Sequence, residues 1–282
     1  MKQLFRSKKI STAVAVVVSA AALLALMKLC SSPAGTSSPE FLKSGGDTVD
    51  IAIEYSPVSM YYISDSLGGF NYDVLTAIAS KSGIAVKIHP VTSVGQALTG
   101  LDEGLFDIVV ADFPMTLDFQ ERYRFTQPVF IDRQVLLQHV DSVSQDSMVT
   151  SVLDLAGRHV WVSANTPIES RLRNLSSEIG DTIYVESTSE YGAEQLYLLT
   201  SAGEIPLSVV NERLAQALAT DSDHVRIMTD VSFNQFQVWA LRRDNNTLAS
   251  QLDSLILDFK STSEYDDLTR RYFGSPRGRN KK

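Results

Sequence analysis

The stretch VDIAIEYSPVSMYYISDSLGGFNYDVLTAIASKSGIAVKIHP, residues 49–90, decides the fold class. It starts with a short alternating apolar run, Val49–Glu54, which predicts a strand. Apolar residues then recur every four positions over 70–78, which predicts a helix that ends at Gly83. The run Ala85–Pro90 predicts a second strand. A strand, a helix and a strand in this order predict a mainly parallel sheet covered by helices.

The same alternation continues along the chain. A second helix is predicted over 94–101, and buried strands over 106–111 and 134–139. The polar stretch 141–150 is typical of a linker, and strands alternate with helices again from residue 159 onward. The sequence therefore predicts two α/β units in one body.

Composition and charge exclude several classes of protein. The chain has 282 residues, of which 44% are hydrophobic and 21% charged, which is typical of a globular protein. The net charge is −8, but residues 1–30 carry +5, so the rest carries −13. Such an acidic body repels nucleic acid. Cys30 is the only cysteine, which excludes an intrachain disulfide, a cysteine-built zinc site and an iron–sulfur cluster.

The first thirty residues have the pattern of a secretory signal. Four basic residues precede an apolar run, Ile10–Met27. As a helix this run would be about 27 Å long, which is just enough to span a bilayer. The basic end favours a cytoplasmic start, which places the body on the periplasmic side of the cytoplasmic membrane. Three fates remain open: a retained anchor, cleavage near 32–34, or lipidation of Cys30.

Two further segments flank the body. Residues 31–47 are rich in Ser, Pro, Gly and Thr, which predicts a flexible tether. Residues 275–282 are rich in Gly, Arg and Lys, which predicts a basic tail.

Known catalytic and metal-binding motifs are absent from the sequence. It contains no G-x-S-x-G, no Walker loop, no G-x-G-x-x-G and no H-E-x-x-H. The histidines lie too far apart for metal-ligand spacing; they are His89, His139, His159 and His224. The sequence therefore predicts neither a cofactor nor a metal site.

Two segments that directly follow predicted strands are candidates for a binding site. Tyr55-Ser56-Pro57 follows the first strand, and 111–116 follows the third. Ligands of open α/β sheets bind beyond the carboxyl ends of the strands, where an aromatic ring can form a pocket wall. Tyr55 is such a candidate, as is Asp112. Thr116 begins a predicted helix whose free amides could face an anion, or it is a plain helix cap.

A series of different short motifs follows in a fixed order over residues 49–274. They are Gly69-Phe70-Asn71-Tyr72-Asp73-Val74-Leu75, Leu101-x-x-Gly104-x-x-Asp107-Ile108, Thr116 with Glu121-Arg122, Phe125-Thr126-x-Pro128, Gly157-x-x-Val160, Leu241-Arg242-Arg243-Asp244-Asn245 and Tyr272-Phe273-Gly274. In order and spacing the chain resembles the family 3 extracellular solute-binding proteins. Its beginning is most similar to the binding domain of the F-type membrane-bound lytic transglycosylases. The sequence stops where their catalytic domain would start, so the hydrolytic half is expected to be absent.

The resemblance implies a two-lobed periplasmic-binding-protein fold of type II. Lobe 1 is expected over 48–140 plus 233–274 and lobe 2 over 141–232, joined by two crossing strands with the ligand between them. It implies a membrane-tethered, monomeric binding protein, not an enzyme, that captures a small polar ligand for transport with an ABC permease. A sensing or regulatory module of the cell envelope is one alternative. A dehydratase-like enzyme, with Glu54 or Asp112 as its acid, is another.

The resemblance also implies positions for ligand-binding residues. Phe119 stands where amino-acid binders of the family carry an arginine that binds the ligand's carboxylate. Arg122 could take the role of that arginine only if the loop is locally shifted. Asn211 stands where they carry an acid for the α-ammonium, and Thr166 begins a helix of lobe 2. We therefore expect weak binding of simple α-amino acids and better binding of a larger, neutral or anionic ligand that stacks on Tyr55 and Phe119. The expected ligand-binding residues are Tyr55, Asp112, Thr116, Phe119, Arg122, Thr166 and Asn211.

Overall fold

The computed structural model describes residues 48–63, 65–140, 148–220, 224–228 and 231–274. The predicted signal or anchor (1–30), the tether (31–47) and the basic tail (275–282) lie outside these described residues. Every helix within them is too short or too polar to be a membrane span.

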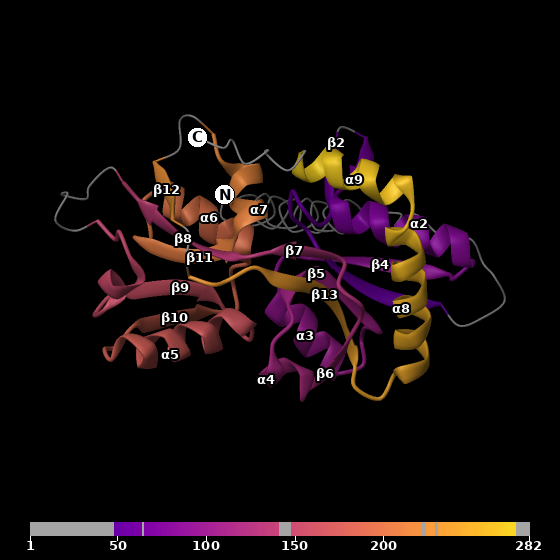
Figure 1. Cartoon of the computed structure of the whole chain (residues 1–282), viewed down its shortest axis with the longest axis horizontal. Helices are drawn as coiled ribbons and strands as arrows, with labels where there is room; N and C mark the ends of the chain where they lie inside the picture. Colours follow the sequence, from indigo (N-terminus) through magenta and orange to yellow (C-terminus); the bar gives the residue numbers. More distant parts are fainter. Residues whose placement is uncertain (1–47, 64, 141–147, 221–223, 229–230, 275–282) are drawn as a thin grey trace, which may run out of the picture. The chain divides into compact units, whose positions relative to one another are not determined.

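The first sheet has six described strands (Figure 1). Their order is β4 (Val86–Val91), β1 (Val49–Glu54), β5 (Ile108–Pro114), β13 (Gln235–Arg242) and β6 (Tyr123–Phe125), and β7 (Phe130–Asp132) pairs with another part of β13. β1 runs parallel to both β4 and β5. β13 returns antiparallel to β5, β6 and β7. The predicted parallel arrangement is confirmed for the first three strands, and β13 is an antiparallel addition.

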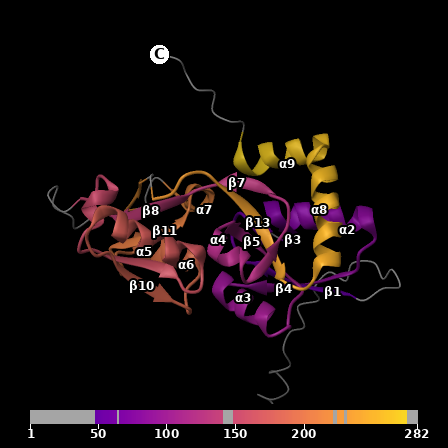
Figure 2. The same ribbon diagram turned by 60° about the horizontal axis from the view of Figure 1, so that its bottom comes forward.

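Helices cover both faces of this sheet. On one face are α2 (Phe70–Ser82), α8 (Asn246–Lys260) and α9 (Ser263–Phe273). On the other are α3 (Val94–Asp102) and the short α4 (Leu117–Gln120). Successive strand residues alternate between the two cores, as the period of a strand requires: Trp239 packs with α2 and α8, whereas its neighbour Val238 packs with α3 and α4. Figures 1 and 2 show α8 on the side of the sheet away from the second sheet.

The second sheet has five described strands. Their order is β10 (Tyr184–Thr188), β9 (His159–Ser163), β11 (Leu207–Asn211), β8 (Gln134–His139) and β12 (Val225–Met228). The first three are parallel, and β8 and β12 are antiparallel to their neighbours. The 3₁₀ helix η2 (Val152–Leu155) and α5 (Pro167–Ile179) pack on one core, and α6 (Ala193–Ser201) and α7 (Glu212–Leu218) on the other.

The chain crosses from one sheet to the other twice. The first crossing is at Arg133, between β7 and β8, and the second lies between β12 and β13. The first crossing therefore precedes the predicted boundary at 140, because 134–139 pairs with β11 in the second sheet. We call the first sheet with α2, α3, α4, α8 and α9 the first lobe, and the second sheet with η2, α5, α6 and α7 the second lobe.

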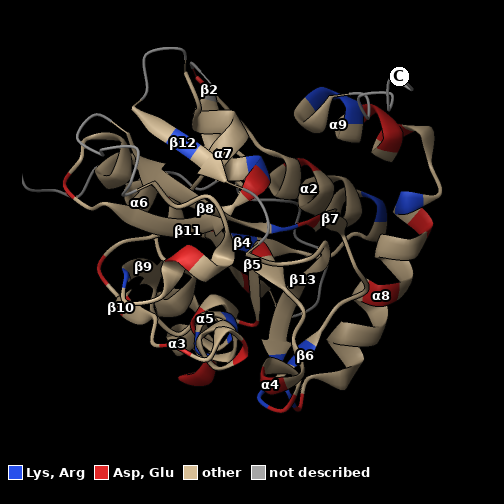
Figure 3. Cartoon of the chain, turned by 60° about the vertical axis from the view of Figure 1, so that its left-hand side comes forward, with Lys and Arg blue, Asp and Glu red and all other residues tan. Residues whose placement is uncertain are grey.

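The motif that begins at Gly69 is held by the end of the chain's last described helix. Gly69 precedes α2 with φ of 128°, and a Cβ there would overlap the carbonyl group of Ser59. Its N–H donates to Tyr272 Oη (2.9 Å), and that hydroxyl donates to Asp73 Oδ2 (2.7 Å). Figure 3 shows both signs of charge on α9, which has acids in its first turn and arginines in its last. These contacts fix α9 against the start of α2.

Candidate ligand-binding site

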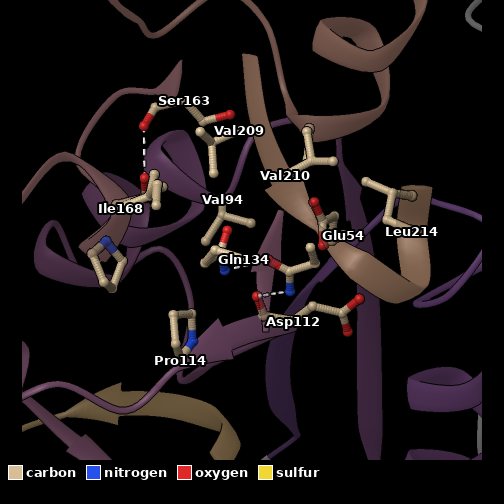
Figure 4. A pocket seen from close by; sticks show the side chains of 14 residues that line it. Glu54, Val94, Asp112, Pro114, Gln134, Ser163, Ile168, Val209, Val210 and Leu214 are labelled. Atoms are coloured by element: carbon tan, nitrogen blue, oxygen red, sulfur yellow. Dashed lines mark hydrogen bonds between the residues drawn. The ribbon is translucent and has the colours of Figure 1, made fainter. Parts of the chain in front are cut away.

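A pocket of about 50 Å³ lies where the two lobes meet. Figure 4 shows its walls: Glu54 and Asp112 come from the first lobe, and Val209, Val210 and Leu214 from the second. β1 and β5 are adjacent parallel strands, so Glu54 at the end of one and Asp112 near the end of the other lie at the same, carboxyl end of the sheet. Ligands of open α/β sheets bind at this end.

Asp112 is held in place from within the first lobe. Its Oδ1 accepts a hydrogen bond from Asn71 Nδ2 (2.9 Å), and the same amide nitrogen donates to Ser59 Oγ (3.1 Å). Trp239 Nε1 donates to Asn71 Oδ1 (3.1 Å), so the asparagine amide cannot rotate without losing a buried partner. Asn71 is fully buried, and the network orients the Asp112 carboxyl at the pocket.

The second lobe reaches across the pocket through Asn211. This residue ends β11 and precedes α7. Its Nδ2 donates to the main-chain carbonyl of Asp112 (2.9 Å), which joins the two lobes. Gln134, the first residue of β8, donates to Asn211 Oδ1 and fixes which way the asparagine amide faces.

The carboxyl groups at and beside the pocket are buried or partly buried and ionise with difficulty. Glu54 is 5% exposed, and burial is the main cause that raises its pKa to about 7, with the charge of Glu194 adding to it; an N–H donated by the Asp112 main chain opposes this. Burial and the neighbouring Glu54 raise the pKa of Asp112 well above its ordinary value. Asp132, at the crossing between the lobes, has its pKa raised to about 7 by burial. The described residues that line the pocket include no Lys or Arg.

Two glycines let the lobes approach each other beside the pocket. A Cβ on Gly95 of α3 would overlap the carbonyl oxygen of Ala164, and one on Gly192 would overlap that of Thr92. Gln96 Nε2 also donates to the Ser189 carbonyl (2.8 Å) across the same boundary. The lobes are therefore in a closed arrangement that a side chain at either glycine would obstruct.

Three of the residues expected from the sequence line the pocket, namely Asp112, Thr166 and Asn211. Tyr55 instead packs partly buried against the core of the first lobe, with its ring 6.5 Å from that of Tyr62. Thr116 begins α4 outside the pocket lining, and its buried hydroxyl has no hydrogen-bond partner.

The two candidates for a carboxylate partner lie elsewhere, which corrects those expectations. Phe119 is 7% exposed and packs in the first lobe against Phe113, with ring centroids 5.2 Å apart. The apolar face of α4 turns toward the core, so this side chain cannot stack on a ligand in the pocket. Arg122 donates to Asp102 Oδ2 (3.0 Å) and to Tyr123 Oη (3.1 Å) at the surface.

Sequence reasoning missed part of the pocket lining. Glu54 was identified only as a possible enzymatic acid, although its place at the end of β1 is the signal for a binding residue. Gln134 and Ser163 carry no motif, and they reach the pocket because β8 and β9 begin or end there.

Comparison with known proteins identifies the family. Residues 48–275 match the family model described as bacterial extracellular solute-binding proteins, family 3. Among curated proteins, the membrane-bound lytic murein transglycosylase F of Desulfosudis oleivorans is 23% identical over 224 residues, which cover 79% of this chain and 48% of that protein. The amino-acid-binding protein AabA of Dichelobacter nodosus is 23% identical over 226 residues, covering 78% and 85%.

A solved structure shows the same fold. An ancestral arginine-binding protein bound to arginine superposes with a TM-score of 0.67 at 20% identity, covering 80% of this chain and 98% of that one. This likeness confirms the type II binding-protein fold that the sequence predicted. The chain spans about half the length of the transglycosylase relatives that it matches.

Proposed function

Because the chain belongs to family 3 of the bacterial extracellular solute-binding proteins, we propose that it captures a small solute in the pocket between its lobes. The pocket itself carries the proposal: both lobes contribute to its walls, and Asn211 bonds to the Asp112 main chain across it. A ligand held from both sides favours the closed arrangement, as in the hinged closure of periplasmic binding proteins.

We further propose that the protein acts outside the cytoplasmic membrane, tethered by its N-terminal segment, and delivers its solute to an ABC permease. The basic and apolar pattern of 1–30 supports export, and the amino-acid-binding relatives support uptake. A sensing or regulatory role without transport is the competing proposal, supported by the likeness to transglycosylases that carry such a domain.

A thermal-shift screen with the full chain tests ligand capture. A solute present at 100 times its Kd stabilises the folded protein by about 2.7 kcal/mol, which is a readily measured shift. Amino acids, amines, small peptides and cell-wall fragments are the compounds to test first. Absence of any shift across all four classes would contradict the proposal.

Uptake of the labelled ligand by cells with and without the gene separates transport from sensing. Loss of uptake in the deletion strain, restored by the intact gene, supports delivery to a permease. Unchanged uptake supports the sensing role.

A second candidate function is acid–base catalysis, as in a dehydratase. Two carboxyl groups, those of the buried Glu54 and the partly buried Asp112, lie in one pocket, and desolvation raises the pKa of both. The distinguishing measurement is turnover: a bound solute recovered unchanged after prolonged incubation supports a binding protein, and conversion that Glu54→Gln abolishes supports an enzyme.

A further inference from the structure

Among the described residues, the lining of the pocket between the lobes holds two acidic side chains and no basic one. Glu54 and Asp112 line it, and no described lining residue is a Lys or Arg. The cation that acts on Asp112 and Asp132 is Arg213, whose guanidinium lies 3.8 Å from the centre of the Phe273 ring, outside the pocket lining. A buried carboxylate without a cation is costly, so such a group either takes up a proton or gains a partner of opposite charge.

The hydrogen-bonding groups of the pocket also favour a ligand that donates hydrogen bonds. The side chains of Ser163, Thr166 and Asn211 each donate to a main-chain carbonyl of the protein. Gln134 donates to Asn211. The carboxyl group of Glu54, by contrast, acts only as an acceptor when it is ionised, and it accepts a main-chain N–H from Asp112. The pocket thus offers the carboxyl oxygens of Glu54 and Asp112 to a ligand, while each of the four hydroxyl and amide side chains already donates one hydrogen bond within the protein.

The helices that begin at the pocket do not reverse this balance. A helix start favours anions through its free N–H groups. However, α5 begins with Pro167, which has no N–H, and it carries Glu169 in its first turn. α6 carries Glu194 in its first turn. The first-turn acid of α7, Glu212, is paired with Arg133 (2.6 Å), so it adds no net charge.

We infer from this imbalance that the pocket takes an organic cation without a carboxylate, an amine or a guanidinium compound, whose positive group lies against Glu54 and Asp112. The inference rests on the proposed binding function and names the ligand class. A zwitterionic amino acid would bring a carboxylate into a site that has no cation to receive it. This inference differs from the sequence-based expectation of a neutral or anionic ligand.

The size of the closed pocket limits the group that it holds. A cavity needs roughly 10–15 Å³ of this measure to hold one water molecule, so about 50 Å³ accommodates a few non-hydrogen atoms. An ammonium or guanidinium head group has this size.

The same charges couple binding to closure. Glu54 belongs to the first lobe and Glu194 to the second, and the charge of Glu194 raises the pKa of Glu54. Like charges on opposite lobes repel when the lobes meet. A cation between them removes this repulsion, so binding favours the contacts made at Gly95 and Gly192.

Calorimetric titration of the full chain with two matched pairs tests the inference. Agmatine differs from arginine, and cadaverine from lysine, only by loss of the α-carboxylate. At pH 8 each amine is expected to bind at least tenfold more tightly than its amino acid. Glu54→Gln should weaken amine binding at least tenfold, and Glu194→Gln by a smaller factor. The control Asp102→Asn, which removes one surface charge from the first lobe, should change Kd less than twofold.

The pH profile provides a second readout. The charged groups that face Glu54 are Asp112 and Glu194, with Asp132 and Arg213 next to them. Amine affinity of the natural protein should fall as the pH drops below about 7, because Glu54 takes up a proton, and Glu54→Gln should flatten this profile.

Each other outcome overturns the inference in a distinguishable way. Tighter binding of arginine or lysine than of the matched amine overturns the ligand class and leaves solute binding intact. The same holds if no amine binds but an anionic or neutral compound of the wider screen does. Absence of binding by every compound overturns the proposed function as well. If Glu54→Gln does not fold, Glu194→Gln and the pH profile of the natural protein decide.

Discussion

The two ends of the first sheet carry the same kind of side chain in opposite settings. At the amino end Asp107 pairs with Arg242 (3.1 Å) and accepts the Asp50 N–H (2.9 Å). At the carboxyl end the buried Glu54 and the partly buried Asp112 lie in one pocket without a cation in its described lining. This difference indicates two roles. The paired acid stabilises the fold, whereas the unpaired acids lower the stability of the folded protein and are available to bind a ligand.

Of the substitutions that test this comparison, removal of the Glu54 charge should change the free energy of unfolding most. Burial raises its pKa from 4.5 to about 7, so its charged form is disfavoured only in the folded state. The penalty is absent below the unfolded pKa and grows as the pH rises toward 7, to about 3 kcal/mol at most. Urea titrations of ligand-free Glu54→Gln should therefore show this much added stability at pH 8 and little at pH 4.5. Equal stabilities at pH 8 would contradict the penalty.

The opposite substitution at the amino end should destabilise the protein. Asp107→Asn weakens the charge-assisted bonds to Arg242 and the Asp50 N–H, which is expected to lower the unfolding free energy by about 1–2 kcal/mol. Ligand affinity should not change, since Asp107 is not part of the pocket lining. A gain in stability in the same urea titrations would contradict the claim that Asp107, unlike Glu54, stabilises the fold.

Obstructing closure should weaken binding without changing the pocket. In Gly192→Ala the added Cβ would overlap the carbonyl oxygen of Thr92 when the lobes meet, so the closed arrangement is disfavoured. We expect the Kd for agmatine to rise about tenfold, with the unfolding free energy unchanged within about 1 kcal/mol. Ser201→Ala, at the far end of α6, serves as the control. An unchanged Kd would mean that ligand binding does not need this contact.

The smallest effect is expected at Arg122. Its ion pair with Asp102 is half-exposed, so Arg122→Ala should lower stability by less than about 1 kcal/mol. Calorimetry should show a change in Kd of less than twofold, because the guanidinium lies outside the pocket. A tenfold loss of affinity would instead restore Arg122 as a ligand partner.

Much of the fold was predictable from local pattern. The strand at 49–54 and the helix from Phe70 to its end at Gly83 appear as predicted, because apolar spacing and a glycine with positive φ encode them directly. The hairpin of β2 (Tyr61–Ile63) and β3 (Ser66–Gly68) was not predicted, nor were β6 and β7. Strands of three residues have too few alternations to show a period, and their pairing depends on distant parts of the chain.

Three pocket residues were predictable, each from a different signal. Asp112 follows from its place near the end of a strand, Thr166 from its place at a helix start, and Asn211 from the resemblance to the family. Phe119 shows the limit of counting along the sequence, because the orientation of the four-residue α4 is set by packing against Phe113. Gln134 depends on where the chain crosses between sheets, which no local pattern encodes.

Proton release on binding tests the central claim most directly, that a cation replaces a proton between the acids of the pocket. Agmatine can be titrated into the full chain at pH 6.5 in two buffers of different ionisation enthalpy. With a pKa of about 7, Glu54 is about three-quarters protonated at pH 6.5, so binding should release up to about three-quarters of a proton from it, and Glu54→Gln should abolish this part of the release. Binding with no proton exchange, or with proton uptake, would contradict the account.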